Sequence, residues 1–182
     1  KADLVSRGLS ELEIMHLGAK STNSGYILPI KNPLGQILGF QIRLRDANSG
    51  RYRWHKPFGI SAQQQNGELP LAFHKPFHDD IQVDCQRVVL VEGTGVKPYL
   101  ASKLRGCVAI GASGGQFVAS KETLQSYLEA IGAKPDVTRL EYAIDAGDVG
   151  NPSVMRRHER NLDFIADLGY QTDVLWWGQF TK

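Results

Sequence analysis

Three acidic residues follow segments that have the character of β-strands, and their placement could create a cation site. Glu92 comes directly after the apolar run 88–91. Asp145 and Asp148 follow the strand-like segment 139–144. Ligand-binding residues of a parallel sheet lie at the carboxyl ends of its strands, and Mg²⁺ prefers carboxylate oxygens, water and phosphate. Each acid alone fits a solvated strand end or a turn, but the two strand ends together favour a shared Mg²⁺ site.

A basic and aromatic stretch lies earlier in the chain and could bind nucleic acid. Between residues 43 and 56, only Asp46 is acidic. Guanidinium and ammonium groups bind phosphates, and aromatic faces stack on bases. The same pattern fits a solvated strand face with its tryptophan packed inward, and both readings stay open. The residues that we expect to contact nucleic acid or nucleotide are Arg43, Arg45, Arg51, Arg53, Trp54 and Lys56.

Three further features could carry chemistry but fit structural roles better. The glycine-rich segment 111–115 follows a strand, yet it matches neither a P-loop nor a dinucleotide fingerprint, which favours a tight turn. His158 falls on the apolar stripe of a predicted helix and is expected to be a core histidine. A solvated helix face, with one or two residues able to reach a phosphate, is expected for Arg156, Arg157 and Arg160.

The elements that must position these residues change in character along the chain. Up to about residue 77, short helical and β-rich segments with a hairpin over 26–43 indicate a small α+β unit. From residue 87, apolar strand-like runs alternate with helical patterns, which is typical of a mostly parallel sheet flanked by helices. The sequence therefore predicts two domains, an α+β subdomain over 1–84 and an α/β domain over 85–182.

Composition excludes several classes of protein. The 182 residues are 42% hydrophobic and carry 21 basic against 19 acidic groups, a net charge of +2. This balance excludes a polybasic tail protein and a charge-driven disordered chain. No apolar run reaches the roughly 18 residues of a membrane helix, so we expect no membrane partner. Cys85 and Cys107 form no Cys-x-x-Cys pair, which favours a reducing cytoplasm.

The order of these features resembles the catalytic core of bacterial-type DNA primases, a family built around a Toprim domain. Residues 4–10 are similar to the family's helix entry, and residues 26–40 to the hairpin that follows it. Residues 88–93 resemble the Toprim strand with its metal-binding glutamate, and residues 144–150 resemble its paired-aspartate motif. The resemblance covers most of the chain, in which the family's zinc-binding and helicase-binding regions have no counterpart.

Two departures from the family pattern affect the acidic site. The family spaces its aspartates Asp-x-Asp, whereas here Asp145 and Asp148 are three residues apart. Carboxylates three residues apart on an extended chain need a turn to converge, which Gly147 could provide. Residues 93–97 also differ from the aromatic-plus-aspartate sequence usual after the glutamate. The chain therefore resembles a divergent primase of a plasmid or other mobile element, or a primase–helicase fragment.

The resemblance implies a primase-like nucleotidyltransferase that makes RNA primers on single-stranded DNA. It implies a Toprim-like parallel sheet flanked by helices and preceded by a small α+β subdomain. Glu92, Asp145 and Asp148 would be the catalytic acids and the ligands of Mg²⁺ or Mn²⁺. Nucleoside triphosphates, single-stranded DNA, and a replicative helicase or fused helicase domain are the implied partners. Two alternatives stay open, a Toprim nuclease and a non-catalytic DNA-binding module with a degenerate metal site.

Overall fold

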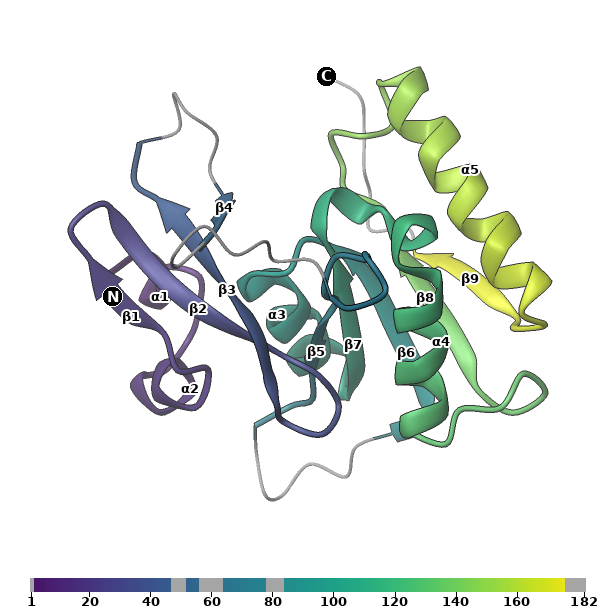
Figure 1. Ribbon diagram of the computed structural model, residues 1–182, viewed down its shortest axis with the longest axis horizontal. Helices are drawn as coiled ribbons and strands as arrows, with labels where there is room; N and C mark the ends of the chain where they lie inside the picture. Colours follow the sequence, from purple (N-terminus) through teal and green to yellow (C-terminus); the bar gives the residue numbers. More distant parts are fainter. Residues whose placement is uncertain (1, 47–51, 56–63, 78–83, 176–182) are drawn as a thin grey trace.

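The residues described by the computed structural model form two β-sheets, which lie side by side in Figure 1. The structure describes residues 2–46, 52–55, 64–77 and 84–175. The first sheet has four strands in the order β1-β2-β3-β4, and the second has five in the order β5-β7-β6-β8-β9. The second sheet is the one that presents the predicted acidic residues.

The first sheet is an antiparallel meander whose strands follow one another in sequence. Its strands are β1 (Lys20–Thr22), β2 (Gly25–Lys31), β3 (Ile37–Leu44) and β4 (Tyr52–Trp54). The expected hairpin is the β2–β3 pair. Its turn is stabilised by Asn32, whose side-chain oxygen accepts hydrogen bonds from the backbone N–H groups of Leu34 and Gln36, both at 3.0 Å.

The second sheet is mostly parallel, and helices cover both of its faces (Figure 1). The strands β6, β7, β8 and β9 are parallel, whereas β5 is an antiparallel edge strand. The five strands of this sheet are β5 (Ala72–His74), β6 (Asp84–Glu92), β7 (Cys107–Ala112), β8 (Arg139–Ala143) and β9 (Thr172–Leu175). The helices are α3 (Val96–Arg105), α4 (Lys121–Ala130) and α5 (Pro152–Asp167), with short 3₁₀ turns η2 (Ser113–Gly115) and η3 (Phe117–Ser120) before α4.

The core of the second sheet explains the continuous apolar run in β6. Val88 and Leu90 pack toward Leu124 of α4 and Ile165 of α5 on one face. Residues on the opposite face, including Val89, pack with those of the α3 side. Because the strand is covered on both faces, all four residues from 88 to 91 are at most 2% exposed. Glu92 is the first residue of β6 after this buried run.

The N-terminal helices α1 (Ala2–Val5) and α2 (Glu11–His16) pack against α3 in an apolar cluster, and one buried carboxylate links α2 to α3. Ser10 and Glu13 form the capping box that begins α2. Glu13 also accepts a hydrogen bond from the Tyr99 hydroxyl at 2.8 Å, and the Lys103 ammonium lies 2.8 Å from it. Burial alone would raise the pKa of Glu13, but these hydrogen bonds lower it to about 2. The ionised carboxylate therefore joins the first part of the chain to the second.

The predicted α/β class with a parallel sheet flanked by helices is confirmed. The N-terminal α+β unit is also present as an antiparallel sheet with two short helices. The division into domains at residues 84 and 85 stays a prediction. One strand from before that boundary, β5, pairs with β7 in the second sheet. The chain therefore enters the second sheet before the change in sequence character that suggested the boundary.

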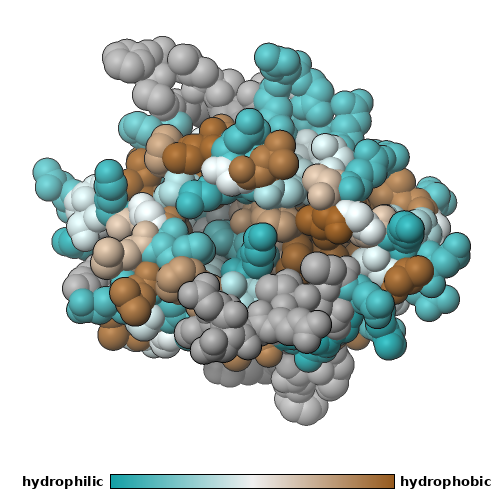
Figure 2. Space-filling model, turned by 90° about the horizontal axis from the view of Figure 1, so that it is seen from below, coloured by the Kyte–Doolittle hydropathy of each residue, from teal (hydrophilic) through white to brown (hydrophobic). Residues whose placement is uncertain are grey.

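The surface is mixed in character. Figure 2, which views the molecule from below, shows hydrophilic and hydrophobic residues interspersed over the described part of that face. Among the described residues, no helix is both long enough and apolar enough to cross a bilayer.

Candidate functional site

The three predicted acids lie at the same edge of the second sheet. Glu92 is the last residue of β6, and Asp145 lies two residues beyond the end of β8. The strands β6 and β8 are hydrogen-bonded parallel neighbours, with Val91 opposite Ala143. Their carboxyl ends therefore meet. The side chains of Glu92, Asp145 and Asp148 are 27%, 37% and 17% exposed, so each is reachable from solvent.

A single guanidinium connects the acids of the two strands. Alternation along β6 turns Glu92 to the same face as Val88 and Leu90, which is the face covered by α5. There the Arg157 Nη2 atom lies 3.6 Å from Glu92 Oε2 and 3.7 Å from Asp148 Oδ2. The Nε atom of Arg157 is buried and has no hydrogen-bond partner. Arg157 therefore has a donor to spare at the acidic edge.

The third acid is paired with a lysine from the first turn of α3. This helix begins four residues after β6 ends, which brings its first turn to the edge where Glu92 lies. The Lys97 Nζ atom lies 2.5 Å from Asp145 Oδ2. The Lys97 side chain is 46% exposed, so this ion pair is in contact with water and is weak by nature.

The electrostatics of the edge favour the arrival of a cation. Burial raises the pKa of Glu92, and the carboxylates of Asp148 and Asp145 raise it further. Lys97 and Arg157 act in the opposite direction without reversing the shift. Burial is the largest cause of this shift, and only the part due to Asp148 and Asp145 reflects a negative potential at Glu92. A divalent cation would be stabilised by the same potential.

A chain of buried hydrogen bonds orients Asp148. The Asn161 side-chain oxygen accepts from the Val118 backbone N–H, and its nitrogen donates to the Gly115 carbonyl and to the Tyr142 hydroxyl. These backbone partners fix the amide orientation, since the N–H needs an acceptor and the carbonyl needs a donor. Tyr142 Oη already accepts from Asn161. Its own proton is therefore free to be donated onward.

That onward partner is His158, and the chain of bonds sets its protonation. The Tyr142 hydroxyl lies 2.9 Å from His158 Nδ1, and His158 Nε2 lies 2.8 Å from Asp148 Oδ2. With Tyr142 donating to Nδ1, the imidazole proton resides on Nε2 and is donated to the carboxylate. His158 is 2% exposed, as expected of a core histidine, but it also holds an acid of the site. This arrangement resembles the outer partners that orient metal-binding carboxylates.

Replacing His158 with alanine is expected to weaken Mn²⁺ binding by roughly 10–100-fold, the usual effect of losing such an outer partner. Tyr142→Phe is expected to act in the same direction with a smaller effect, because it removes only the bond that fixes the imidazole tautomer. Isothermal titration with Mn²⁺ measures both, with melting temperatures as the test of folding. Equal Mn²⁺ affinity in a folded His158→Ala protein would contradict the positioning role.

One aromatic residue of the basic stretch, Tyr52, faces the acidic edge. A cavity of about 130 Å³ is lined by Glu92 and Lys97 from the second sheet's side and by Gln41 and Tyr52 from the first sheet. The Gln41 amide donates a 2.6 Å hydrogen bond to the Thr94 hydroxyl, which joins the two sheets beside this cavity. The first sheet therefore forms one wall of the candidate site.

The predicted nucleic-acid residues are distributed over both faces of that wall. Arg43 shares the face of Tyr52, donates a 2.5 Å hydrogen bond to its hydroxyl and pairs with Asp3. Trp54 is on the same face and packs against Gly39, whereas Arg53 pairs with Ile42 on the opposite face. Arg45 is exposed just beyond β3. Arg51 and Lys56 lie outside the described residues, and the binding role of the whole set stays a prediction.

The donor chemistry of the edge fits a divalent cation, although the acids are occupied by the chain's own bases. Three carboxylates with residual negative charge are the ligand type that Mg²⁺ and Mn²⁺ prefer. Among the described residues, no three ligating side chains are grouped closely enough to hold a metal ion in their present positions. Asp145 would need to exchange Lys97 for the ion. Glu92, Asp145 and Asp148 are the residues that would hold it.

The glycine-rich segment has a structural explanation. A Cβ atom at Gly111 would lie 2.1 Å from the Gly93 carbonyl oxygen and 2.2 Å from Pro98 Cγ. The Gly93 N–H in turn donates a 2.6 Å hydrogen bond to the Ala112 carbonyl. Gly111 therefore lets β7 approach the turn that follows Glu92, and the tight turn expected over 111–115 is present as η2 over Ser113–Gly115. Gly147 does not have a positive φ, and a Cβ there would meet nothing within 4 Å.

Comparison with known proteins supports the fold only. No family model matches the sequence, and no curated protein matches it either. A solved DnaG catalytic core is similar to 97% of this chain with a TM-score of 0.51 and 14% identity. The Aquifex aeolicus primase, solved with its zinc-binding and RNA polymerase domains, is similar over 100% of this chain with a TM-score of 0.50 and 15% identity.

A third similar structure is a DnaG primase catalytic domain bound to single-stranded DNA. It matches 96% of this chain with a TM-score of 0.50 and 12% identity. The matched regions cover 64%, 44% and 54% of the three solved chains in the order given, so this chain spans about half their length. At these identities the shared feature is the primase catalytic core fold. This fold agrees with the resemblance found in the sequence.

Proposed function

We propose that this chain is a primase-like nucleotidyltransferase that synthesises RNA primers on single-stranded DNA. The observation that carries the proposal is the meeting of Glu92, Asp145 and Asp148 at one edge of a sheet with the primase core fold. In this reaction a primer 3′-hydroxyl loses its proton to solvent and its oxygen attacks the α-phosphorus of a nucleoside triphosphate. A new O–P bond forms, the α–β bridging bond breaks, and pyrophosphate leaves.

The side chains of the edge suit a triphosphate. The Arg157 side chain is 27% exposed, and Lys97 is exposed enough to move from Asp145 to a phosphate oxygen. The three carboxylates would hold Mg²⁺ or Mn²⁺, which when bound adds positive charge beside the phosphates. Because the protein performs little covalent chemistry in phosphoryl transfer, positioning and charge neutralisation by these residues would determine the rate.

The wall formed by the first sheet suits the template. One structural neighbour is a primase domain bound to single-stranded DNA. In this chain we place the DNA along the face of β3 and β4 that carries Arg43 and Trp54, with Arg45 exposed at its end. Arg53, Arg51 and Lys56 are the further residues that we propose to bind phosphate. Aromatic faces and cationic groups together are the usual means of binding single strands without sequence preference.

The biological setting that we propose follows from the sequence resemblance. The altered aspartate spacing and the unusual residues after Glu92 fit a divergent primase that acts in plasmid or mobile-element replication. A replicative helicase or a fused helicase domain would be its partner, and the cytoplasm its location.

A primer-synthesis assay tests the proposal. With Mn²⁺ or Mg²⁺, single-stranded DNA and labelled nucleoside triphosphates, the wild-type chain is expected to form short labelled RNA. Asp145→Ala is expected to abolish the product, because it removes one of the three carboxylates. An exposed acid of α5, Glu159, provides the matched control Glu159→Gln, which should retain full activity. Product of equal yield from Asp145→Ala would contradict the assignment.

One observation favours a second function, a DNA-binding module without catalysis. Asp145 is paired with Lys97, and Arg157 lies between Glu92 and Asp148, so the chain can neutralise much of its own acidic edge. Such a module would bind single-stranded DNA with an affinity that falls steeply with salt, yet would form no primer. DNA cleavage in the same assay without added nucleotides would instead indicate a Toprim nuclease.

A further inference from the structure

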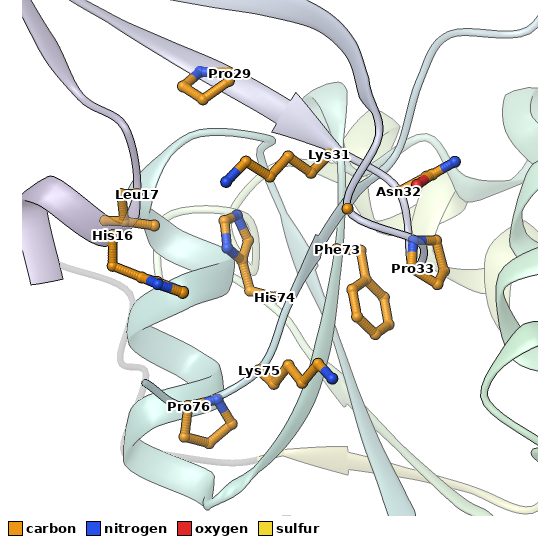
Figure 3. A pocket seen from close by; sticks show the side chains of 11 residues that line it. His16, Leu17, Pro29, Lys31, Asn32, Pro33, Phe73, His74, Lys75 and Pro76 are labelled. Carbon is orange, nitrogen blue, oxygen red and sulfur yellow. The ribbon is translucent and has the colours of Figure 1, made fainter. Parts of the chain in front are cut away.

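A second cavity lies away from the three acids, and Figure 3 shows the residues that line it. Its volume is about 240 Å³, and it lies between the end of α2, the β2–β3 hairpin and the edge strand β5. Because β5 is antiparallel to β7, the chain after His74 moves away from the edge that carries Glu92. The cavity is therefore separate from the candidate active site.

Basic side chains from three elements converge on this cavity. His16 ends α2, Lys31 ends β2, His74 ends β5, and Lys75 follows directly. In Figure 3 the Lys31 side chain extends toward the His74 ring. No aspartate or glutamate is present among the described lining residues. We call the group His16, Lys31 and His74 the lysine–histidine pocket.

Packing holds the two histidine rings in place. The His16 ring stacks on Phe77 with centroids 4.1 Å apart, and the His74 ring lies edge-on to Tyr99 at 6.0 Å. The carboxylate next to Tyr99, Glu13, is already bonded to Tyr99 and Lys103. No ion pair links Lys31 to an acidic side chain of the described chain. The pocket thus places the Lys31 ammonium beside two packed imidazoles, with no acidic side chain among its described lining residues.

The basic groups disfavour one another's charged forms. Burial lowers the pKa of His74 to about 4, with further lowering by Lys31 and His16. Burial and Lys31 also lower the pKa of His16. An anion bound between these groups would attract each of them and would raise the pKa values of both imidazoles. The anion-binding character of the pocket therefore rests on the Lys31 ammonium and the lack of an acidic side chain among the lining residues that the structure describes.

We propose that the lysine–histidine pocket binds the phosphate group of a small phosphorylated compound. The phosphate would contact Lys31 and the two imidazoles, and the compound's less polar part would lie against apolar lining residues such as Phe73 and Pro33. A cavity of about 240 Å³ lies below the roughly 300 Å³ at which typical ligand pockets begin, which suits a small molecule better than a nucleic-acid strand. This site is independent of the proposed primase activity.

Titration of the metal-free protein with inorganic pyrophosphate, ribose 5-phosphate and AMP tests this proposal. Histidine ¹H–¹³C NMR should show the pKa values of His16 and His74 rising by roughly one unit or more as the pocket fills. The three probes distinguish a bare anion, a sugar phosphate and a nucleotide as the compound bound. Adenosine, which lacks the phosphate, should leave both rings unchanged.

The variant Lys31→Gln should weaken binding of the effective probe at least 10-fold, because it removes the central positive charge. Lys20→Gln, which removes an exposed lysine from β1 of the same sheet, is the matched control and should bind normally. Unchanged His16 and His74 signals with all three phosphates would overturn the proposal. Equal affinity in Lys31→Gln, or an equal response to adenosine, would overturn it as well.

Discussion

Replacing Glu92 with glutamine is expected to remove Mn²⁺ binding while leaving the protein folded. The substitution keeps the shape of the side chain but removes a carboxylate, so the loss should exceed the roughly 10–100-fold expected for an outer partner such as His158. Primer synthesis should fall with it. Because burial and two neighbouring carboxylates raise the pKa of Glu92, its ionised form destabilises the folded protein at neutral pH. The glutamine variant should therefore unfold at the same temperature as the wild type or higher.

The sign of that stability effect follows from linkage. A carboxyl pKa that is higher in the folded state opposes folding above that pKa, and the penalty disappears as the pH falls below the unfolded value. The difference in melting temperature between Glu92→Gln and wild type should thus shrink on acidification. Isothermal titration and calorimetry over a pH series measure both quantities. Full metal affinity and activity in Glu92→Gln would remove Glu92 from the site.

Gly111→Ala is expected to have the largest effect on stability. The added methyl group would be placed 2.1 Å from the Gly93 oxygen and 2.2 Å from Pro98, and neither backbone nor proline ring can move aside freely. Overpacking of this kind costs about 3 kcal/mol, which corresponds to a melting temperature lower by roughly 6–12 °C for a chain of this size. Because Gly93 follows Glu92, residual folded protein should also bind Mn²⁺ more weakly.

Gly147→Ala is the matched control for that prediction. Its Cβ would meet no atom within 4 Å, and its backbone is open to any residue. Thermal unfolding followed by circular dichroism should show a change within about 0.5 kcal/mol. The control also tests the idea that the turn between Asp145 and Asp148 depends on glycine. If Gly111→Ala were as stable as Gly147→Ala, the close approach of β7 to the turn after Glu92 would be wrong.

The placement of the acids could be predicted because strand pattern fixes which end of a strand a residue occupies. The apolar run of β6 stops at Glu92, and parallel strands bring their carboxyl ends together, so Asp145 had to lie near the same edge. What the pattern does not contain is distance. Whether two carboxylates share an ion or a guanidinium depends on side-chain directions that only the folded structure has.

The bases of the edge were missed for different physical reasons. Arg157 was expected on a solvated helix face, but its position beside His158 turns it toward the acids. In the sequence, Lys97 stands out only as part of an unusual segment after Glu92. A usable signal existed for it, since a helix that starts so soon after a strand has its first turn at that strand's carboxyl end. No such signal linked His158 to Asp148, because the helical stripe reports burial and not hydrogen bonding.

The edge strand β5 shows a different limit of sequence patterns. Three residues, Ala72–His74, carry too little periodicity to be assigned to one sheet or the other. Its pairing with β7 is fixed by tertiary contacts, with Phe73 in the core shared by α4. The lysine–histidine pocket depends on the same strand, because His74 reaches it from β5. The pocket was therefore invisible in the sequence, where its residues are up to 58 positions apart (His16 to His74).

The central claim is that carboxylates from two strands act as one site, and a double-mutant cycle on Mn²⁺ binding tests it most directly. Mn²⁺ affinity is measured by titration for wild type, Glu92→Gln, Asp148→Asn and the double variant. If both acids hold the same ion, the second substitution should add little to the first, because the site is already lost. Losses that simply add, or an Asp148→Asn protein with wild-type affinity, would show that the two acids act separately and would contradict the account.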